Sequence, residues 1–179
     1  MKKACLLISL GILFFYSCTG QHENKDRGYI VNIGDTAPDF KMELVSGEKV
    51  SLSQYNGKVV MLQFTASWCG VCRREMPYIE EEIWQVLKDN DNFALLAIDR
   101  DEPRETVIAY SNKVGISYPI GLDPGADIFT RYAEREAGIT RNVIINREGK
   151  IIFLTRMFDK KEFNEMKEVI FKELGYNEQ

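Results

Sequence analysis

The fold of this chain is indicated most directly by the stretch FTASWCGVCRREMP, residues 64–77. It continues the apolar run VVMLQF (59–64) and opens an amphipathic stretch, so Cys69 and Cys72 lie where a predicted strand leads into a predicted helix. A thiolate at a helix N-terminus faces unpaired backbone N–H groups and the positive end of the helix dipole, which lower its pKa toward neutrality. This arrangement is typical of a redox-active dithiol.

A Cys-x-x-Cys pair also has other interpretations: half of a zinc site, a permanent crosslink, or two buried thiols that lie close together. Zinc in proteins usually takes four ligands, but the other cysteines, Cys5 and Cys18, and the only histidine, His22, all lie near the N-terminus. A crosslink that closes a ring of about four residues would stabilise the fold by only about 2 kcal/mol. Redox chemistry is therefore favoured, and a structural pair and a metal site stay open as alternatives.

The N-terminus has the pattern of an export signal. The positive segment MKK is followed by an apolar stretch, residues 4–15, that is too short to span a bilayer comfortably. The stretch ends in FYSC (15–18), which resembles a bacterial lipobox, in which the cysteine is acylated and becomes the first residue after cleavage. Tyr16 is larger than the residue usual at its position, so a plain signal peptide cut nearby is the alternative.

These features predict a lipoprotein signal peptide at 1–17, a lipid anchor on Cys18 with a polar tether over 18–29, and one domain over 30–179. About 150 residues are enough for a single core and too few for two. The net charge is −4 with acids and bases interspersed, so no nucleic-acid partner is expected. We predict an extracytoplasmic protein held at a membrane, in an oxidising compartment where Cys69 and Cys72 are the only free thiols.

Strand and helix patterns alternate along the domain, which predicts an α/β sheet with helices on both faces. In the helix expected from Arg73 onward, Ile79, Ile83, Val86 and Leu87 are predicted to be core residues, and Pro77 is predicted to kink the helix after its first turn. We expect strands at 41–45, 49–52, 59–65, 93–98, 118–122, 143–146 and 150–154, and helical segments at 51–55, 104–114, 127–133 and 163–174.

Four blocks carry a resemblance to a known family: GDTAPDF (34–40), NGKVV (56–60), residues 64–77 and VIINREGKI (143–151). Together they resemble the TlpA/ResA-like branch of the thioredoxin superfamily, which consists of membrane-tethered, extracytoplasmic thiol–disulfide oxidoreductases. The resemblance covers residues 34–173. It implies a thioredoxin-like fold with an N-terminal hairpin, and with a central insert that includes residues 102–114.

The resemblance also implies roles for residues of the motif. Cys69 corresponds to the exposed nucleophile, Cys72 to the resolving thiol and Trp68 to a ring that shields them. Glu75 corresponds to a glutamate that influences the acid–base behaviour of the thiols; the alternative is a surface acid that stabilises the first helical turn. The motif residues expected to shape the site are Gly70, Val71 and Pro77.

The sequence departs from the family pattern at three positions. Gln63 replaces a buried acid of many thioredoxins, Val71 replaces a proline inside the motif, and Thr140 replaces the family's cis-proline. Because a non-proline cis bond costs about 2.5–4 kcal/mol, we predict a trans Ile139–Thr140 bond, with Gly138 and Arg141 absorbing the change and a looser substrate groove.

Residues Ile139, Thr140 and Arg141 are expected to bind the substrate, and Arg141 is expected to project toward the site and favour acidic partners. The predicted activity is disulfide exchange with extracytoplasmic proteins in the reducing direction, without a cofactor and with a membrane electron donor.

Two rival functions stay open. A thiol peroxidase shares the 34–40 block but needs Thr or Ser three residues before its reactive cysteine, where this chain has Cys69 before Cys72. A Cu(I)-binding module could use the two thiolates, although the domain has no histidine.

Overall fold

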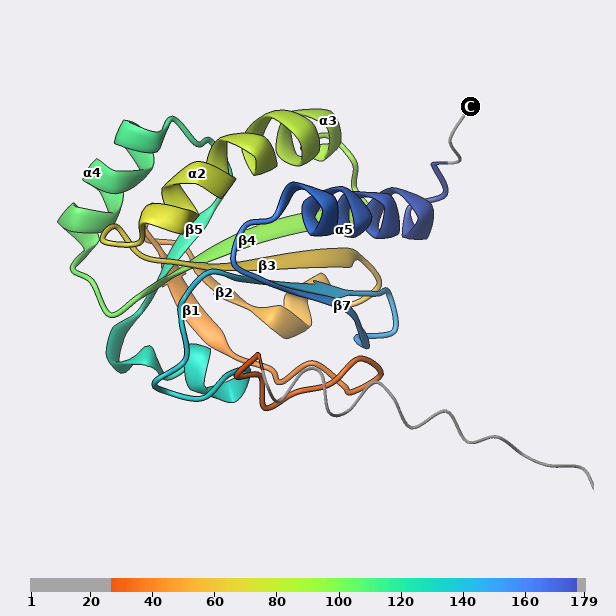
Figure 1. The fold of residues 1–179 in the computed structure, drawn as a ribbon, viewed down its shortest axis with the longest axis horizontal. Helices are drawn as coiled ribbons and strands as arrows, with labels where there is room; N and C mark the ends of the chain where they lie inside the picture. Colours follow the sequence, from red (N-terminus) through yellow and green to blue (C-terminus); the bar gives the residue numbers. More distant parts are fainter. Residues whose placement is uncertain (1–26, 177–179) are drawn as a thin grey trace, which may run out of the picture.

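Seven strands form one mixed sheet in the computed structural model, which describes residues 27–176 (Figure 1). The strand order is β2-β1-β5-β4-β3-β6-β7; β3, β4 and β5 run parallel, and the other neighbouring strands pair antiparallel. The strands are β1 (Lys41–Leu44), β2 (Lys49–Ser51), β3 (Val59–Thr65), β4 (Phe93–Arg100), β5 (Ile120–Asp123), β6 (Arg141–Ile145) and β7 (Ile151–Arg156).

Helical segments lie on both faces of this sheet, as predicted, but they differ in kind. In Figure 1, α2, α3, α4 and α5 all lie above the sheet, whereas 3-10 turns and the chain before β1 lie below it. The helices are α2 (Gly70–Ile79), the π-helical turn η2 (Glu80–Trp84), α3 (Gln85–Leu87), α4 (Arg104–Val114) and α5 (Lys160–Glu173); the 3-10 turns are η1 (Leu52–Tyr55), η3 (Pro124–Ala126) and η4 (Phe129–Arg131).

The central strands are buried on both faces, which explains their continuous apolar sequences. All seven residues of β3 are buried, and its Phe64 packs edge-on against Phe129, with ring centroids 5.5 Å apart, on the lower face. The upper face of β3 carries Gln63 and Thr65 at the end where the strand leads toward α2. The sheet therefore brings polar side chains under the N-terminus of that helix.

The helix after β3 begins at Gly70, earlier than Arg73, and α2 continues through Pro77 as far as Ile79. The helix is therefore not interrupted after its first turn, and the irregularity follows as the π-helical turn over Glu80–Trp84; a kink at Pro77 stays a prediction. The turn also changes which side chains face the core.

Ile79, Ile83 and Leu87 are fully buried as predicted, but Val86 is 55 % exposed. The π-helical turn contains one extra residue, so later side chains rotate by about one residue position around the helix axis. Leu87 therefore takes the inward position that an uninterrupted α-helix would give to Val86.

The segment 127–133 was expected to be a helix, but only the three residues of η4 are helical there. Asp123 explains the short turn, because its carboxylate accepts hydrogen bonds from the backbone N–H groups of Ile128 (2.8 Å) and Phe129 (2.9 Å). Gly125 has a φ of 73° and Ala126 a φ of 59°, both left-handed, so no regular helix can enter this segment from the residues before it.

The other predicted elements are confirmed. Strands β1 and β2 form the N-terminal hairpin with Met42 opposite Val50, β6 and β7 form the second hairpin, and α4 covers 104–114. Between residues 27 and 176, none of the helices is long and apolar enough to cross a bilayer.

Candidate active site

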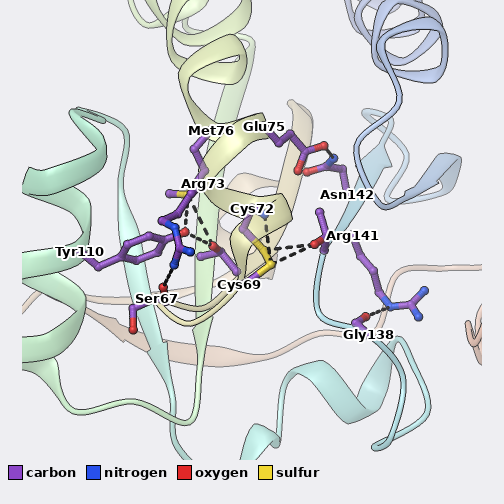
Figure 2. Close-up of a disulfide and its surroundings, with 12 residues drawn as sticks. Ser67, Cys69, Cys72, Arg73, Glu75, Met76, Tyr110, Gly138, Arg141 and Asn142 are labelled. Atoms are coloured by element: carbon purple, nitrogen blue, oxygen red, sulfur yellow. Dashed lines mark hydrogen bonds between the residues drawn. A yellow bond between two sulfur atoms is a disulfide. The ribbon is translucent and has the colours of Figure 1, made fainter.

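Cys69 and Cys72 form a disulfide at the N-terminus of α2, where β3 leads into the helix (Figure 2). Their Cα atoms are 5.3 Å apart, and the Cys72 backbone N–H donates a hydrogen bond to Cys69 Sγ over 3.1 Å. Cys69 is the residue that caps the helix, so its sulfur occupies the place where a capping oxygen usually accepts from the first turn. A thiolate at this position would meet the same donor.

The two sulfurs differ in how far solvent reaches them. Cys69 is 6 % exposed and Cys72 is fully buried. Trp68, directly before Cys69, is 62 % exposed and presents an apolar surface beside the disulfide. Gly70 and Val71 form the first turn of α2 between the two cysteines. A partner molecule therefore reaches Cys69 more easily than Cys72, which agrees with the roles predicted for them.

Thr140, directly before β6, lies against the disulfide. Its hydroxyl oxygen is 3.1 Å from Cys69 Sγ and 3.2 Å from Cys72 Sγ. The structure contains no cis peptide bond within residues 27–176, so the Ile139–Thr140 bond is trans, as predicted.

Arg141 does not project toward the site, so the expectation that it selects acidic partners is wrong. Its side chain is fully buried, donating hydrogen bonds to the carbonyl oxygens of Gly138 (2.9 Å) and Arg27 (2.7 Å), and its guanidinium stacks on the Tyr29 ring. Successive side chains of a strand point to opposite faces. Because Thr140 and Asn142 face the dithiol side, Arg141 must face the other side.

Substrate binding by residues 139–141 stays a prediction, and it has to use their backbone. The side chains of Ile139, Thr140 and Arg141 are all buried.

Glu75 is a buried group, so its interpretation as a surface acid is wrong. It lies on α2, is 2 % exposed, and one of its oxygens accepts a hydrogen bond from Asn142 Nδ2 over 2.7 Å. Burial raises the pKa of Glu75 to about 7, against the opposing effect of the Asn142 hydrogen bond. The carboxyl group can therefore gain or lose a proton near neutral pH.

The sequence analysis missed a second buried carboxyl group, Asp99. It is fully buried near the carboxyl end of β4, opposite Thr65 of β3, and neither of its oxygens has a hydrogen-bond partner. Burial, together with the nearby Glu102 carboxylate, raises the pKa of Asp99 to about 8. An acid that ends a buried apolar strand beside the motif was the signal that could have identified it.

Glu102 connects this carboxyl group to the loop that carries the cysteines. Its carboxylate accepts hydrogen bonds from the Ser67 backbone N–H (2.5 Å) and hydroxyl (2.6 Å). Arg73 donates to the Ser67 carbonyl oxygen from the other side. The loop before Cys69 is therefore held by hydrogen bonds from two sides, to the Glu102 carboxylate and to the Arg73 guanidinium.

A groove of about 510 Å³ lies beside this loop, between α2 and the insert helix α4. Neither cysteine is among the residues that line it. Its lining residues include Ser67, Arg73, Glu105, Tyr110 and Lys113.

The described part of the chain contains no group of three or more His, Cys, Asp or Glu side chains that could hold a metal ion. Apart from Cys69 and Cys72, neither a thiol nor an imidazole occurs in residues 27–176. A zinc site would need further ligands that these residues do not bring together.

Comparisons with known proteins agree with this geometry. The Redoxin family profile matches residues 32–170. The thiol-disulfide oxidoreductase ResA of Geobacillus kaustophilus is 30 % identical over 151 residues, which cover 84 % of this chain and 83 % of that protein.

Two solved structures are similar as well. A candidate protein disulfide isomerase from Bacteroides thetaiotaomicron is 60 % identical with a TM-score of 0.81, over 83 % of this chain and 93 % of that one. A candidate thiol:disulfide interchange protein DsbE from Chlorobium tepidum is 27 % identical with a TM-score of 0.69, over 81 % of this chain and 99 % of that one. These similarities confirm the resemblance of the four sequence blocks to thioredoxin-like thiol–disulfide oxidoreductases.

Proposed function

Because this chain belongs to the Redoxin family and is a thiol–disulfide oxidoreductase, we propose that it reduces disulfides of extracytoplasmic proteins through Cys69 and Cys72. The observation that carries the proposal is a disulfide at a helix N-terminus in which Cys69 is 6 % exposed and Cys72 is fully buried. A merely structural crosslink has no need for this asymmetry. Disulfide exchange requires it, because one thiol must contact the substrate and the other must be placed to attack the mixed disulfide afterwards.

In the reducing direction the Cys69 thiolate attacks one sulfur of the substrate disulfide. The Cys69–substrate bond forms, the substrate S–S bond breaks, and the released substrate thiolate takes up a proton. Cys72 then loses its proton and attacks Cys69 Sγ, which forms the Cys69–Cys72 bond and releases the second substrate thiolate. Two electrons have passed from the dithiol to the substrate, and the proton lost by Cys72 together with one proton from solvent protonates the two released substrate thiolates.

Glu75 supports the second step. It follows Cys72 by one turn of α2, is buried, and has a pKa of about 7, so its carboxylate can accept a proton inside the protein near neutral pH. No group other than the dithiol is needed for the electron transfer itself.

The proposed location follows from the N-terminus. Residues 1–17 would be a signal peptide, Cys18 would carry the lipid, and a membrane electron donor would return Cys69–Cys72 to the dithiol. Of the expected tether, 18–29, residues from Arg27 onward are packed on the domain, because Arg27 pairs with Glu162 and Tyr29 is buried, so the tether would end before Arg27. Cys18 and most of the tether lie outside the described residues. The support is the sequence pattern alone.

Disulfide exchange can be tested with the full chain and a disulfide-bonded protein such as insulin. The reduced protein should cleave the insulin disulfides, and Cys69→Ser should abolish this activity, whereas Ser111→Ala on the insert helix should retain it. Equal activity of Cys69→Ser and wild type would refute the assignment.

The direction of electron flow can be tested by the reduction potential of the Cys69/Cys72 couple. A value of about −250 mV or lower supports a reductase, and a value of about −120 mV contradicts it.

The anchor can be tested by fractionation of the producing cells, because Cys18→Ser should release the protein from membranes. Equal membrane association of wild type and variant would refute the lipid anchor.

A further inference from the structure

We propose that the Thr140 hydroxyl is a hydrogen-bond donor to the Cys69 thiolate in the reduced protein, and that it sets the acidity and the reduction potential of the dithiol. The proposal deepens the proposed function, because it requires only that Cys69 is the thiol that reacts. It assigns a chemical role to the side chain that stands where the family pattern implied by the sequence has a proline, a residue without a side-chain donor.

The first argument is the direction of the hydrogen bond. Thr140 Oγ1 lies 3.1 Å from Cys69 Sγ and 3.2 Å from Cys72 Sγ, and it has no other hydrogen-bond partner among residues 27–176. Neither sulfur of a disulfide carries a proton, so the hydroxyl must be the donor. Thr140 is 4 % exposed, so water competes little for this proton.

The second argument is that the hydroxyl is held in place. The Thr140 carbonyl oxygen accepts a hydrogen bond from the Met157 N–H over 3.0 Å, which ties the start of β6 to the end of β7. The next residue, Arg141, is anchored by its buried side chain on the opposite face. Because threonine is branched at Cβ, its side chain also has few rotamers. The donor therefore stays near the sulfurs without a large loss of conformational freedom.

The third argument is what happens when the disulfide is reduced. A thiolate on Cys69 would accept from the Cys72 backbone N–H, already 3.1 Å from Sγ, and from the Thr140 hydroxyl. Hydrogen bonds to a charged acceptor are about twice as strong as neutral ones, and donation to the charged form favours that form. The hydroxyl thus lowers the thiol pKa and stabilises the reduced protein relative to the disulfide.

Other charged groups surround the dithiol, and they remain the same in the variants below. Glu75 and Arg73 lie on α2, Asp99 lies on β4, and Glu102 follows that strand and binds Ser67. None of these four side chains is hydrogen-bonded to Thr140 in the structure. A change caused by loss of the hydroxyl can therefore be measured against a constant electrostatic background.

The experiment compares Thr140→Val, which has nearly the same shape without the hydroxyl, with Thr140→Ser, which keeps the hydroxyl. The rate of iodoacetamide labelling of Cys69 is followed against pH in the reduced full-length proteins, with the labelled site identified by mass spectrometry. We expect Thr140→Val to raise the Cys69 pKa by about one unit, which lowers the labelling rate about tenfold below that pKa. Thr140→Ser should stay within about threefold of wild type.

The reduction potential provides a second readout that a purely structural role would not change in this way. A tenfold loss of thiolate stabilisation corresponds to a potential about 30 mV more negative for Thr140→Val, measured where the wild-type thiolate is populated. If Thr140→Val does not fold, Thr140→Ala replaces it and the same shifts are expected.

Two results would overturn the proposal. One is a pKa and a potential for the hydroxyl-free variant equal to those of wild type. The other is a Thr140→Ser variant that shifts as far as Thr140→Val, because the geometry of the side chain rather than its hydroxyl would then be responsible. Neither readout needs a substrate, so failure here is distinguishable from a wild-type protein that fails to reduce insulin.

Discussion

The two ends of the central strands differ sharply in chemistry, although the strands are continuous. At the end away from α2, β3 contributes only apolar side chains from Val59–Leu62, and the facing parts of β4 and β6 are apolar as well. At the end that leads to the dithiol, Gln63 lies opposite Asn142, and Thr65 lies opposite Asp99. The apolar side chains at the first end are explained by burial in the core, whereas the polar side chains at the second end surround the dithiol.

The buried side-chain N and O atoms that have no hydrogen-bond partner follow the same division. In the described part of the chain, every one of them belongs to the dithiol end; they are Gln63 Nε2, Glu75 Oε2, both oxygens of Asp99, Arg141 Nη1 and Asn142 Oδ1. Each such atom costs free energy that a fully paired or apolar side chain would not cost. The comparison indicates that the apolar end contributes most of the free energy of unfolding. The unpaired polar groups at the dithiol end lower that free energy.

The largest effect should come from the apolar end. Leu62 is fully buried in β3, so Leu62→Ala should lower the free energy of unfolding by about 2–5 kcal/mol because it leaves a cavity. Denaturant unfolding measures this change. Val86→Ala is the matched control, because Val86 is 55 % exposed and its truncation should change the stability by about 0.5 kcal/mol or less. A similar loss in both variants would contradict the assignment of Leu62 to the core and of Val86 to the surface.

The next effect should come from the dithiol end and have the opposite sign. Asp99→Asn keeps the shape of a buried side chain whose charged form is unfavourable, so it should stabilise the protein by about 1–3 kcal/mol at pH 8 and above. The pKa of Asp99 is about 8 in the folded protein and near 3.9 when unfolded. Between these values the unfolded chain releases the proton more readily, so this group lowers stability as the pH rises.

The gain of Asp99→Asn should therefore be near zero below pH 4, grow between pH 4 and 8, and then level off. Unfolding curves across this range measure it. Asp91→Asn, at an exposed position beside β4, should show no such trend. A gain for Asp99→Asn that is independent of pH would contradict the raised pKa.

The smallest effect concerns Glu75. Its carboxylate, when charged, disfavours a nearby thiolate, so Glu75→Gln should lower the apparent thiol pKa by a fraction of a unit up to about one unit without unfolding the domain. Because the pKa of Glu75 is about 7, the rates of iodoacetamide labelling should differ above pH 7 and converge below it. Glu81→Gln on the exposed side of the same helical segment is the control. Identical profiles for all three proteins would leave Glu75 without a role at the thiols.

The same comparison explains what the sequence could predict. The apolar runs of β3 and β4 and the hairpins follow directly from periodicity and turn residues, and the dithiol follows from a motif at a strand-to-helix junction. Val86 was misplaced because a π-helical turn leaves no simple mark in the hydrophobic pattern. Arg141 was misplaced because a charged residue was assumed to be exposed, although strand alternation from Thr140 already directed it to the other face.

Asp99 and Glu102 were missed for a related reason. Their place in the site depends on which side chains the sheet register brings beneath α2, and that register cannot be predicted directly from the sequence. The Thr140 hydroxyl is similar, since the sequence indicated a missing proline but not a donor 3.1 Å from a sulfur. Polar side chains at the ends of buried strands are therefore the places where sequence reasoning needs the structure most.

The most direct test of the account is the capture of a mixed disulfide. The Cys72→Ser protein is incubated in reduced form with a disulfide-bonded protein, and the adduct is mapped by mass spectrometry. The account predicts a stable mixed disulfide at Cys69, because attack survives and resolution is lost. Failure to form an adduct, or an equal yield through Cys72 in the Cys69→Ser protein, would contradict the assignment of Cys69 as the attacking thiol.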